Sequence, residues 1–501
     1  MKNKQFILGA FFSYGAILFN IVSGLLFTPW MIDQLGDDQY ALYTLAISVI
    51  NIFLMDFGIG SAVTKFLSNY YAKKEYDEAN VFMAVVYKIF IFISLVIALV
   101  LTVFYFLIDG IYVKLTPTEL IVFKHLFIIV GVYSVISFPF TTFKGVLVAN
   151  ERFIEEKLCE FFQKFFNVVL VLIFLLLGEG VYALVLVHAF TNLFFMIVKY
   201  FIIRKRTRQK ISIVHWNRDV AKSLFGYSIW TTVMSLAQRC IFNIMPTVIA
   251  AIIGSAEITV FSLASTLEGY VYTFASAING MLMPGVSRIL NKDESNLRIM
   301  DLMKKIGKYQ ICTIGLLYLG FLCLGKVFVG LWMGEGYEMI YWGALLLIFP
   351  SLISMPQQVA GNALLVKDVV REQAFIYVGM ATINIVLSIV FINMLGIIGA
   401  SLSICISYLF SSVCKNILYK KKLKIALFDF FKSVYAGWII VFVVTLLVFK
   451  FAIDLISVAG WIGFVIKGII LSVIYLSLYY AFCIDKETRT ELFNKMVKRQ
   501  K

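Results

Sequence analysis

Residues Gly36 to Ala46 read GDDQYALYTLA, and residues Gly254 to Ala264 read GSAEITVFSLA. Both stretches begin with glycine and end with Leu-Ala, and similar residue types stand between, at an offset of 218 positions. Self-similarity at a fixed offset is the signature of a duplicated unit. The chain is therefore predicted to contain two copies of one unit.

Prolines mark the same repeat. Pro29 and Pro139 recur 217 residues later as Pro246 and Pro356, in a chain with 7 prolines. A proline inside a helix removes a backbone hydrogen bond and loosens the helix, so we expect these four prolines to act in gating. Two of them sit in matching stripes of polar residues, formed by Ser134, Ser137 and Thr141 in the first copy and by Ser351, Ser354, Gln358 and Asn362 in the second.

The composition indicates a membrane protein with many spans. Of the 501 residues, 61% are hydrophobic and 15% are charged, and the mean hydropathy is +0.91. Soluble domains are far less apolar. Stretches long enough to cross a bilayer as helices predict an all-α polytopic fold with fourteen spans, at about 6–32, 40–64, 83–108, 119–147, 158–177, 180–203, 224–253, 258–286, 306–333, 339–366, 372–393, 396–418, 431–452 and 456–484.

Basic residues set the orientation, because cytoplasmic segments are enriched in Lys and Arg. They gather at both ends of the chain and at the even-numbered turns, as in the run RKRTRQK from Arg204 to Lys210. Both termini are therefore predicted to be cytoplasmic. The formal charge of +15 follows from this topology and does not indicate nucleic-acid binding. The outer side carries only Lys114, Lys124, Lys326, Lys450 and Lys467.

Six predicted spans separate each element from its repeat. An even number returns the second copy to the same orientation, so the copies are parallel repeats related by a pseudo-two-fold axis along the membrane normal. We expect a six-helix N-terminal lobe over residues 1–215 and a six-helix C-terminal lobe over residues 216–422. Two further spans and a basic cytoplasmic tail fill residues 423–501.

The sequence carries no signature of an enzyme or of a cofactor. It contains no GxxxxGK[ST], GxSxG or HExxH motif, and no outer connection is long enough for a catalytic domain. The 7 cysteines stand singly without CxxC spacing, and the 3 histidines are scattered. We therefore expect a protein that is not an enzyme, with no catalytic residues, no metal site and no cofactor.

Arg239 is the clearest functional candidate. It lies near the middle of the span predicted at 224–253, and a charge at that depth should face protein or a watery cavity. Helical spacing places Ser235, Arg239 and Asn243 on one stripe, beside Gln238. These side chains are predicted to contact an anionic substrate. The alternative is an ion pair between Arg239 and a neighbouring helix.

Two acidic residues inside spans have open roles. Glu268 lies on a polar face and is predicted either to pair with Arg239 or to take part in ion coupling. Asp56 is predicted either to pack or pair with an inner-side base such as Lys65 or Lys144, or to couple transport to protons or sodium, or to contact substrate. Polar stripes of other spans add further predicted substrate contacts at Asn20, Gln358 and Asn362.

Longer motifs resemble a known family. YALYTLA from Tyr40, followed by DFGIGSAVTKF from Asp56, closely resembles the opening of polysaccharide-type flippases. KGVLVANERF from Lys144 and LGIIGASLSICISYLF from Leu395 continue the match. These flippases export repeat units of O-antigen, capsule or exopolysaccharide and belong to the multidrug, oligosaccharidyl-lipid and polysaccharide exporter superfamily. The resemblance implies two six-helix lobes in a V around a central cavity, with alternating access.

The same resemblance implies the cargo, which would be an undecaprenyl-diphosphate-linked oligosaccharide moved from the inner to the outer leaflet of the bacterial cytoplasmic membrane. Implied partners are this substrate, membrane lipids and a polysaccharide polymerase or ligase. The drive would be H⁺ or Na⁺ coupling or consumption of the product. The family's cationic cavity maps onto Arg239, supported by Gln238 and Asn243.

Two other functions stay open at this point. A cation-coupled multidrug extruder more commonly has an acidic ion site in its first helix, whereas the first span here has no carboxylate before Asp33. A membrane-embedded glycosyltransferase or polymerase is the third interpretation.

Overall fold

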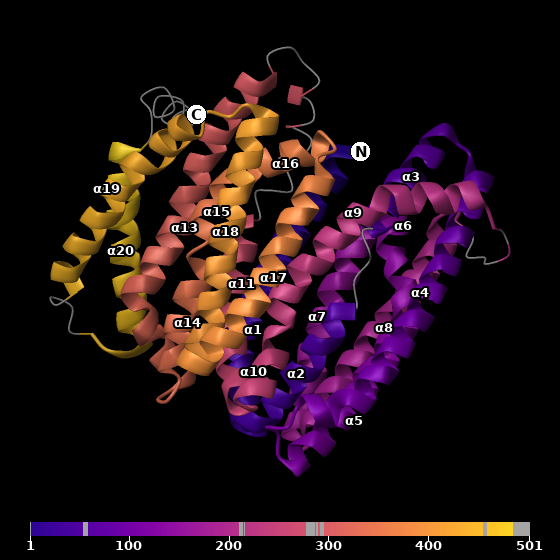
Figure 1. Cartoon of the computed structure of the whole chain (residues 1–501), viewed down its shortest axis with the longest axis horizontal. Helices are drawn as coiled ribbons and strands as arrows, with labels where there is room; N and C mark the ends of the chain where they lie inside the picture. The colour runs from indigo at the N-terminus through magenta and orange to yellow at the C-terminus, as the bar shows by residue number, and fades with distance from the viewer. Residues whose placement is uncertain are drawn as a thin grey trace. The chain divides into compact units, whose positions relative to one another are not determined.

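The computed structural model describes residues 2–53, 59–209, 214, 216–276, 286, 289–290, 295–453 and 458–483. Every regular element in these ranges is a helix (Figure 1), which confirms the predicted all-α class. The chain forms two compact units. Unit 1 comprises Met1–Leu263 and Arg371–Ile404, and unit 2 comprises Ala264–Val370 and Cys405–Lys501. The lobe boundaries predicted from the repeat stay a prediction.

Unit 1 holds the whole of the predicted first copy together with the two helices that contain Arg239 and Pro246. Its long helices pack side by side: α2 lies against α5, and α7 lies against both α1 and α8. The helices are α1 (Lys2–Leu35), α2 (Asp37–Phe53), α3 (Ile59–Lys73), α4 (Tyr76–Ile111), α5 (Pro117–Ser137), the 3-10 turn η1 (Phe138–Thr142), α6 (Phe143–Ala149), α7 (Phe153–Leu176), α8 (Val181–Arg206), α9 (Arg218–Asn243), α10 (Met245–Ile252) and α17 (Val370–Leu395).

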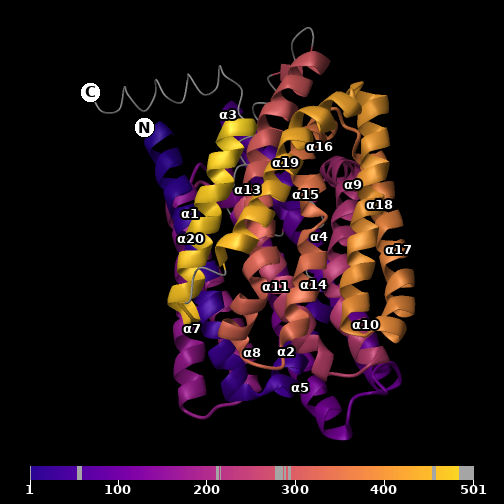
Figure 2. The ribbon, with the colours of Figure 1, turned by 90° about the vertical axis from the view of Figure 1, so that its left-hand side faces the viewer.

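Unit 2 is built around one long helix, α13, which contacts α14, α16, α19 and α20. Figure 2 shows α13, α19 and α20 running alongside one another. Its helices are α13 (Ser295–Met333), α14 (Glu338–Ile348), α15 (Ser351–Ser354), the 3-10 turn η3 (Met355–Gln357), α16 (Gln358–Val366), α19 (Leu427–Ile453) and α20 (Gly460–Phe482), while α11 (Ala256–Ser276) and α18 (Ile397–Leu423) run across the boundary between the units.

Among the described residues, 11 helices are long and apolar enough to cross a membrane, or up to 12 if the bent pair formed by α9 and α10 counts as one span. These twelve coincide with twelve of the predicted spans. The remaining two, at 40–64 and 258–286, each include residues outside the described ranges. The chain is thus a multi-pass membrane protein, and the count of fourteen stays a prediction.

Glycines at equivalent positions of the two copies share a left-handed backbone conformation. Gly36 and Gly254 have φ angles of 79° and 103°, and Gly178 and Gly396 have φ angles of 85° and 59°. Only glycine adopts this left-handed region without steric cost, which is why it ends helices so often. Each pair therefore ends equivalent helices of the two copies, and the structure supports the duplication at these four turns.

Three of the four repeat prolines interrupt their helices. Pro139 lies in η1 and Pro356 in η3, so a 3-10 turn breaks the span at the same place in both copies. Pro246 is the second residue of α10, which follows α9 after a bend of 40°. Pro29, in contrast, lies inside the continuous α1. The loosening expected from proline is seen at three positions, and a gating role stays a prediction for all four.

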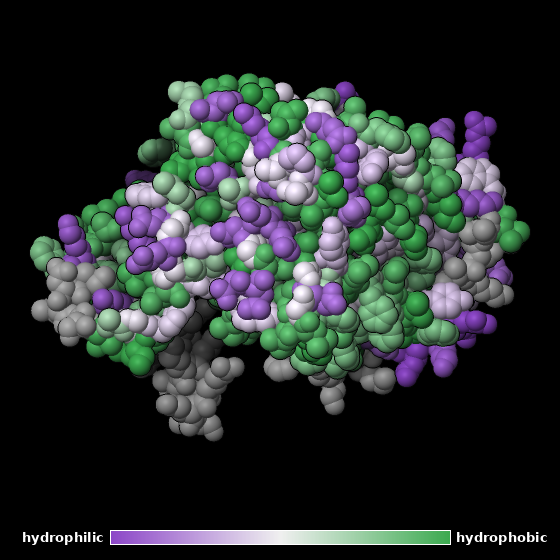
Figure 3. Space-filling model, turned by 90° about the horizontal axis from the view of Figure 1, so that it is seen from below, coloured by the Kyte–Doolittle hydropathy of each residue, from purple (hydrophilic) through white to green (hydrophobic). Residues whose placement is uncertain are grey.

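The ends of the helices carry polar residues, as the short connections between spans require. Seen from below, hydrophilic side chains gather in patches among hydrophobic ones (Figure 3). On the flanks of the helices, large apolar side chains such as Phe106 and Leu99 are 75% and 66% exposed. Such exposure suits helices surrounded by lipid.

Candidate functional site

The polar stripe predicted on α9 is formed by a regular helix with a well-capped start. The side chain of Asn217 accepts hydrogen bonds from the N–H groups of Asp219 and Val220, at 2.9 and 3.2 Å, which satisfies donors that a helix start otherwise leaves open. From there α9 runs without interruption to Asn243. Its spacing of four residues places Ser235, Arg239 and Asn243 on one face.

These residues line a polar recess of about 350 Å³, formed by Ser235, Gln238, Arg239, Phe242 and Asn243. The structure therefore brings together the four α9 residues predicted from the sequence and adds Phe242. The Arg239 side chain is exposed within unit 1, whereas Gln238 and Asn243 are half-buried. A cation placed in a membrane span is expected to face a watery cavity in this way.

The position of Arg239 is set by the first copy. Its Nη1 donates to the backbone carbonyl of Asn51 on α2, at 3.3 Å, and α9 packs against α2, α3 and α4. The side-chain amide of Asn243 donates to the carbonyl of Arg239, one turn back, at 3.1 Å. The guanidinium offers five N–H donors in a planar fork, so the recess can hold an anion with two parallel hydrogen bonds.

The segment beyond the Pro246 bend, from α10 to the start of α11, is held at three points within unit 1. Tyr112 Oη donates to Thr247 Oγ1 at 3.3 Å, Ser255 Oγ donates to a carboxylate oxygen of Glu119, and Thr259 Oγ1 donates to the carbonyl of Asp37 at 3.0 Å. Burial raises the pKa of Tyr112 to about 12. These bonds join the segment that follows Arg239 to the ends of α2, α4 and α5.

The other predicted contacts belong to other elements of the chain. Asn20 is exposed on α1, while Asp56 lies outside the described residues. Glu268, Gln358 and Asn362 are half-buried and belong to unit 2, where Gln358 Nε2 donates to the sulfur of Met355 at 2.9 Å. Their meeting with Arg239, including the pairing proposed for Glu268, stays a prediction.

An ion-pair cluster between α6 and α7 escaped the sequence reasoning. Lys144 Nζ lies 2.9 Å from Glu160 and 3.7 Å from Glu156, and Lys157 Nζ lies 2.6 Å from Glu160 and 3.5 Å from Glu156. The Glu156 side chain is 2% exposed. The spacing of four between the two glutamates was a signal for a shared face. Lys144, one of the predicted partners of Asp56, is thus engaged by these two carboxylates.

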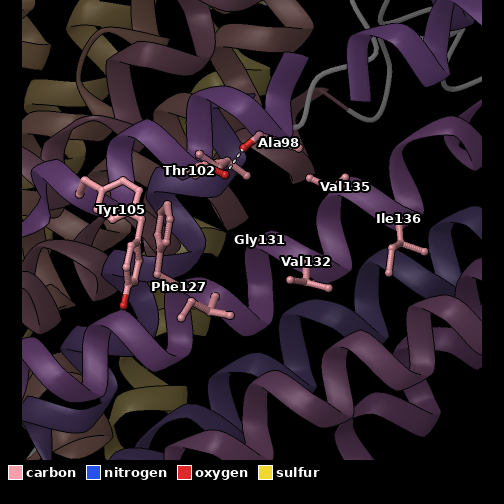
Figure 4. A pocket seen from close by; sticks show the side chains of 11 residues that line it. Ala98, Thr102, Tyr105, Phe127, Gly131, Val132, Val135 and Ile136 are labelled. Atoms are coloured by element: carbon pink, nitrogen blue, oxygen red, sulfur yellow. Dashed lines mark hydrogen bonds between the residues drawn. The ribbon is translucent and has the colours of Figure 1, made fainter. Parts of the chain in front are cut away.

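A second, larger pocket of about 420 Å³ lies between α4 and α5 (Figure 4). Its wall is almost entirely apolar, including Leu101, Phe127, Val132 and Ile136. Figure 4 shows Thr102 turned back onto the carbonyl of Ala98 in its own helix, at 2.8 Å. An apolar pocket in a spanning helix pair cannot stabilise a charged head group, so the recess on α9 is the better candidate site.

Metal ligation finds no support in the part of the chain that the structure describes, where no group of three or more His, Cys, Asp or Glu side chains could hold an ion. Two histidines contact tyrosines instead. His125 lies 3.3 Å from Tyr182 Oη, and the ring of His188 packs edge-on against Tyr133. Both histidines thus contact tyrosines of unit 1.

Comparison with known proteins supports this description of the fold. Residues 35–341 match the family described as polysaccharide biosynthesis protein. No curated protein matches the chain by sequence. Among solved structures, the chain is similar to the lipid II flippase MurJ in an inward closed conformation, with a TM-score of 0.71 and 15% identity over 95% of this chain and 99% of that one.

Two further structures are multidrug transporters. A multidrug resistance MATE family transporter of the MOP superfamily, in an inward-facing conformation, has a TM-score of 0.65 and 13% identity over 82% of this chain and 94% of that one. The Vibrio cholerae MATE transporter VcmN in the bent form has a TM-score of 0.56 and 15% identity over 84% and 97%. The shared fold is that of membrane flippases and transporters.

Proposed function

Because the chain belongs to the polysaccharide biosynthesis protein family and has the fold of membrane flippases and transporters, we propose that it moves an undecaprenyl-diphosphate-linked oligosaccharide across the bacterial cytoplasmic membrane. Transport runs from the inner to the outer leaflet by alternating access, with both chain termini in the cytoplasm. The product then serves a polymerase or ligase that builds a surface polysaccharide such as O-antigen or capsule.

The observation that carries this proposal is the polar recess around Arg239. A guanidinium stays charged at any physiological pH, and its fork matches two oxygens of a phosphate group. A diphosphate head group therefore gains its strongest contacts from this one side chain. Neutral donors and acceptors at Ser235, Gln238 and Asn243 suit sugar hydroxyls, which need hydrogen bonds without charge.

The lipid tail needs no polar contact, because polyprenyl chains are as apolar as the bilayer core. It stays in the hydrocarbon while the head group passes through the protein. The recess thus separates the two ends of the substrate by polarity, as a flippase requires. The source of energy is an H⁺ or Na⁺ gradient or the consumption of the product, and Asp56 and Glu268 are the candidate coupling residues.

A cation-coupled multidrug extruder is the second candidate, favoured by the likeness to MATE transporters. The charge of the recess argues against export of cationic drugs, because a guanidinium repels a cation, whereas it attracts a diphosphate. The two functions therefore predict opposite charge selectivity at the same residue.

A leaflet assay in liposomes separates these functions. The purified chain is reconstituted with a fluorescent polyprenyl-diphosphate oligosaccharide, and the fraction reached by a membrane-impermeant quencher is followed over time. We expect transfer of this substrate, little transfer of a polyprenyl-linked sugar without phosphate, and no uptake of a cationic dye. Uptake of the dye without transfer of the lipid-linked sugar would establish the extruder instead.

A further inference from the structure

Pro139 leaves one carbonyl of its own span without a helical donor. The N–H of Phe138 donates to the carbonyl of Ser134, so the next carbonyl, that of Val135, would need the N–H of residue 139. Proline has none. A hydroxyl from another helix takes this place, because Ser94 Oγ on α4 donates to the Val135 carbonyl at 2.5 Å.

Pro356 repeats the arrangement in the second copy. The N–H of Met355 donates to the carbonyl of Ser351, and the next carbonyl, that of Leu352, faces the proline that lacks an N–H. Here Tyr435 Oη on α19 donates to the Leu352 carbonyl at 2.8 Å. Both proline breaks of the repeat are therefore completed by a side-chain hydroxyl that comes from a neighbouring helix.

The two hydroxyls come from different parts of the chain. Ser94 belongs to the third predicted span of its own copy, whereas Tyr435 belongs to the first of the two spans beyond the repeat. That span lies close against α13. At Gly307 an added Cβ would stand 3.2 Å from Phe430 and Val434 of α19 and from the carbonyl oxygen of Pro356, and at Gly315 it would overlap Trp438. These glycines let α19 approach α13 near the break.

Further hydrogen bonds attach the two C-terminal helices, α19 and α20, to each other and to α13. Trp438 Nε1 donates to Tyr475 Oη at 3.0 Å, and this hydroxyl in turn donates to the carbonyl of Ile311 at 3.4 Å. Tyr479 Oη donates to the carbonyl of Lys308 at 2.6 Å. Tyr435 is therefore presented to the Pro356 break by a helix pair with several anchors of its own.

We propose that Ser94 and Tyr435 are positioning residues of two proline hinges, and that α19 and α20 form the brace of the second hinge. Each hydroxyl holds its span in the geometry seen here, and the bond parts when the span bends. In the second copy, the brace comes from the two added spans. The effect on transport rests on the proposed function, whereas the effect on the hinges does not.

Tyr435→Phe tests the second hinge, because it removes the hydroxyl and keeps the ring. Tyr479→Phe is the matched control. It removes a comparable bond from the same helix pair, but to a carbonyl in the uninterrupted α13, where residue Cys312 supplies the usual N–H. In the first copy, Ser94→Ala removes the hydroxyl that donates to the Val135 carbonyl. Ser94→Thr keeps a hydroxyl at this position and is expected to behave like the wild type.

Amide hydrogen exchange of the full-length protein in nanodiscs gives the first readout. For the peptide over residues 351–360 we expect exchange roughly fivefold faster in Tyr435→Phe, the size expected for one lost hydrogen bond, and unchanged exchange in Tyr479→Phe. Ser94→Ala should act likewise on residues 134–143. Unchanged exchange at both hinges, or an equal rise in the control, would overturn the proposal.

A double-mutant cycle distinguishes a specific role of Tyr435 at the Pro356 break from a general structural role. Pro356→Ala restores an N–H for the Leu352 carbonyl, so Tyr435→Phe should have no effect on exchange in that background. An undiminished effect would show that Tyr435 acts elsewhere. The pair Pro139→Ala and Ser94→Ala repeats the test in the first copy.

Transport in the leaflet assay gives the last readout. Because each hydroxyl bonds to a carbonyl at its own proline break, we expect kcat for leaflet transfer to change at least twofold in Tyr435→Phe while KM stays constant. A change in KM alone would contradict a hinge role. If even the wild-type chain moves no lipid-linked oligosaccharide, the proposed function fails, and the exchange cycle still decides the hinge proposal.

Discussion

Arg239 on α9 donates from Nη1 to the backbone carbonyl of Asn51 on α2, at 3.3 Å. The acceptor belongs to the first copy and the donor to the second, so the cation is placed by a contact between the copies inside unit 1. At the repeat offset of 217, the position in the first copy that corresponds to Arg239 is occupied by Val22. The duplication supplies the scaffold, and this substitution within it supplies the charge.

Asn243→Ala should weaken substrate binding. Asn243 lies in the recess one turn from Arg239, and on the proposed function its amide binds the sugar. We expect KM for the lipid-linked oligosaccharide to rise about 2- to 10-fold, as for a hydrogen bond of about 0.5–1.5 kcal/mol, with kcat unchanged. Asn393→Ala is the matched control, because Asn393 makes the same kind of bond to a carbonyl one turn back, at 2.7 Å, away from the recess. Equal effects in both variants would remove Asn243 from the site.

Glu156→Ala should destabilise unit 1. It leaves Lys144 and Lys157 beside a buried gap where a carboxylate had been. We expect the free energy of unfolding to fall by about 1–3 kcal/mol, which is measured as a lower Tm in detergent. Glu155→Ala removes a half-exposed partner of Arg152 at 3.3 Å and should cost about 0–1 kcal/mol. A Tm for Glu156→Ala as high as that for Glu155→Ala would show that the cluster contributes no special stability.

Gly254→Ala should strain the turn between α10 and α11. With φ at 103°, an alanine meets a backbone conformation that costs roughly 1–2 kcal/mol for residues with a Cβ. Gly110→Ala is the comparison, because Gly110 lies inside α4 with open space around it, and alanine there should be neutral or stabilising. Thermal unfolding of both variants checks the prediction. No difference between them would mean that the turn relaxes without cost.

Much of the helical architecture could be predicted from the sequence, because it depends on local properties. Apolar length gave twelve spans that the described residues contain, and the repeat glycines marked turns that need a left-handed backbone, as at Gly36 and Gly254. The stripe on α9 also predicted the recess, since residues four apart share a face of a helix. These signals lie within a few neighbouring residues and need no knowledge of the partner helices.

The partners of those residues could not be predicted in the same way. The acceptor of Arg239 is a backbone carbonyl, which every residue has, so no side chain marks Asn51 in the sequence. Tyr435 stands 83 positions from Leu352, and a tyrosine in an apolar span equally suits the membrane interface. The division into units also depends on packing between distant helices, and it does not follow the copies.

The proposed function depends on binding of the diphosphate of a lipid-linked oligosaccharide by the Arg239 guanidinium. The leaflet assay with Arg239→Ala decides whether it does, with Asn51→Ala as a control that leaves the backbone acceptor in place. A charge-assisted hydrogen bond of about 1.5–3 kcal/mol predicts a loss of roughly 10- to 150-fold in kcat/KM for Arg239→Ala, a partial loss for Arg239→Lys, and wild-type transfer for Asn51→Ala. Wild-type transfer by correctly inserted Arg239→Ala would contradict the account.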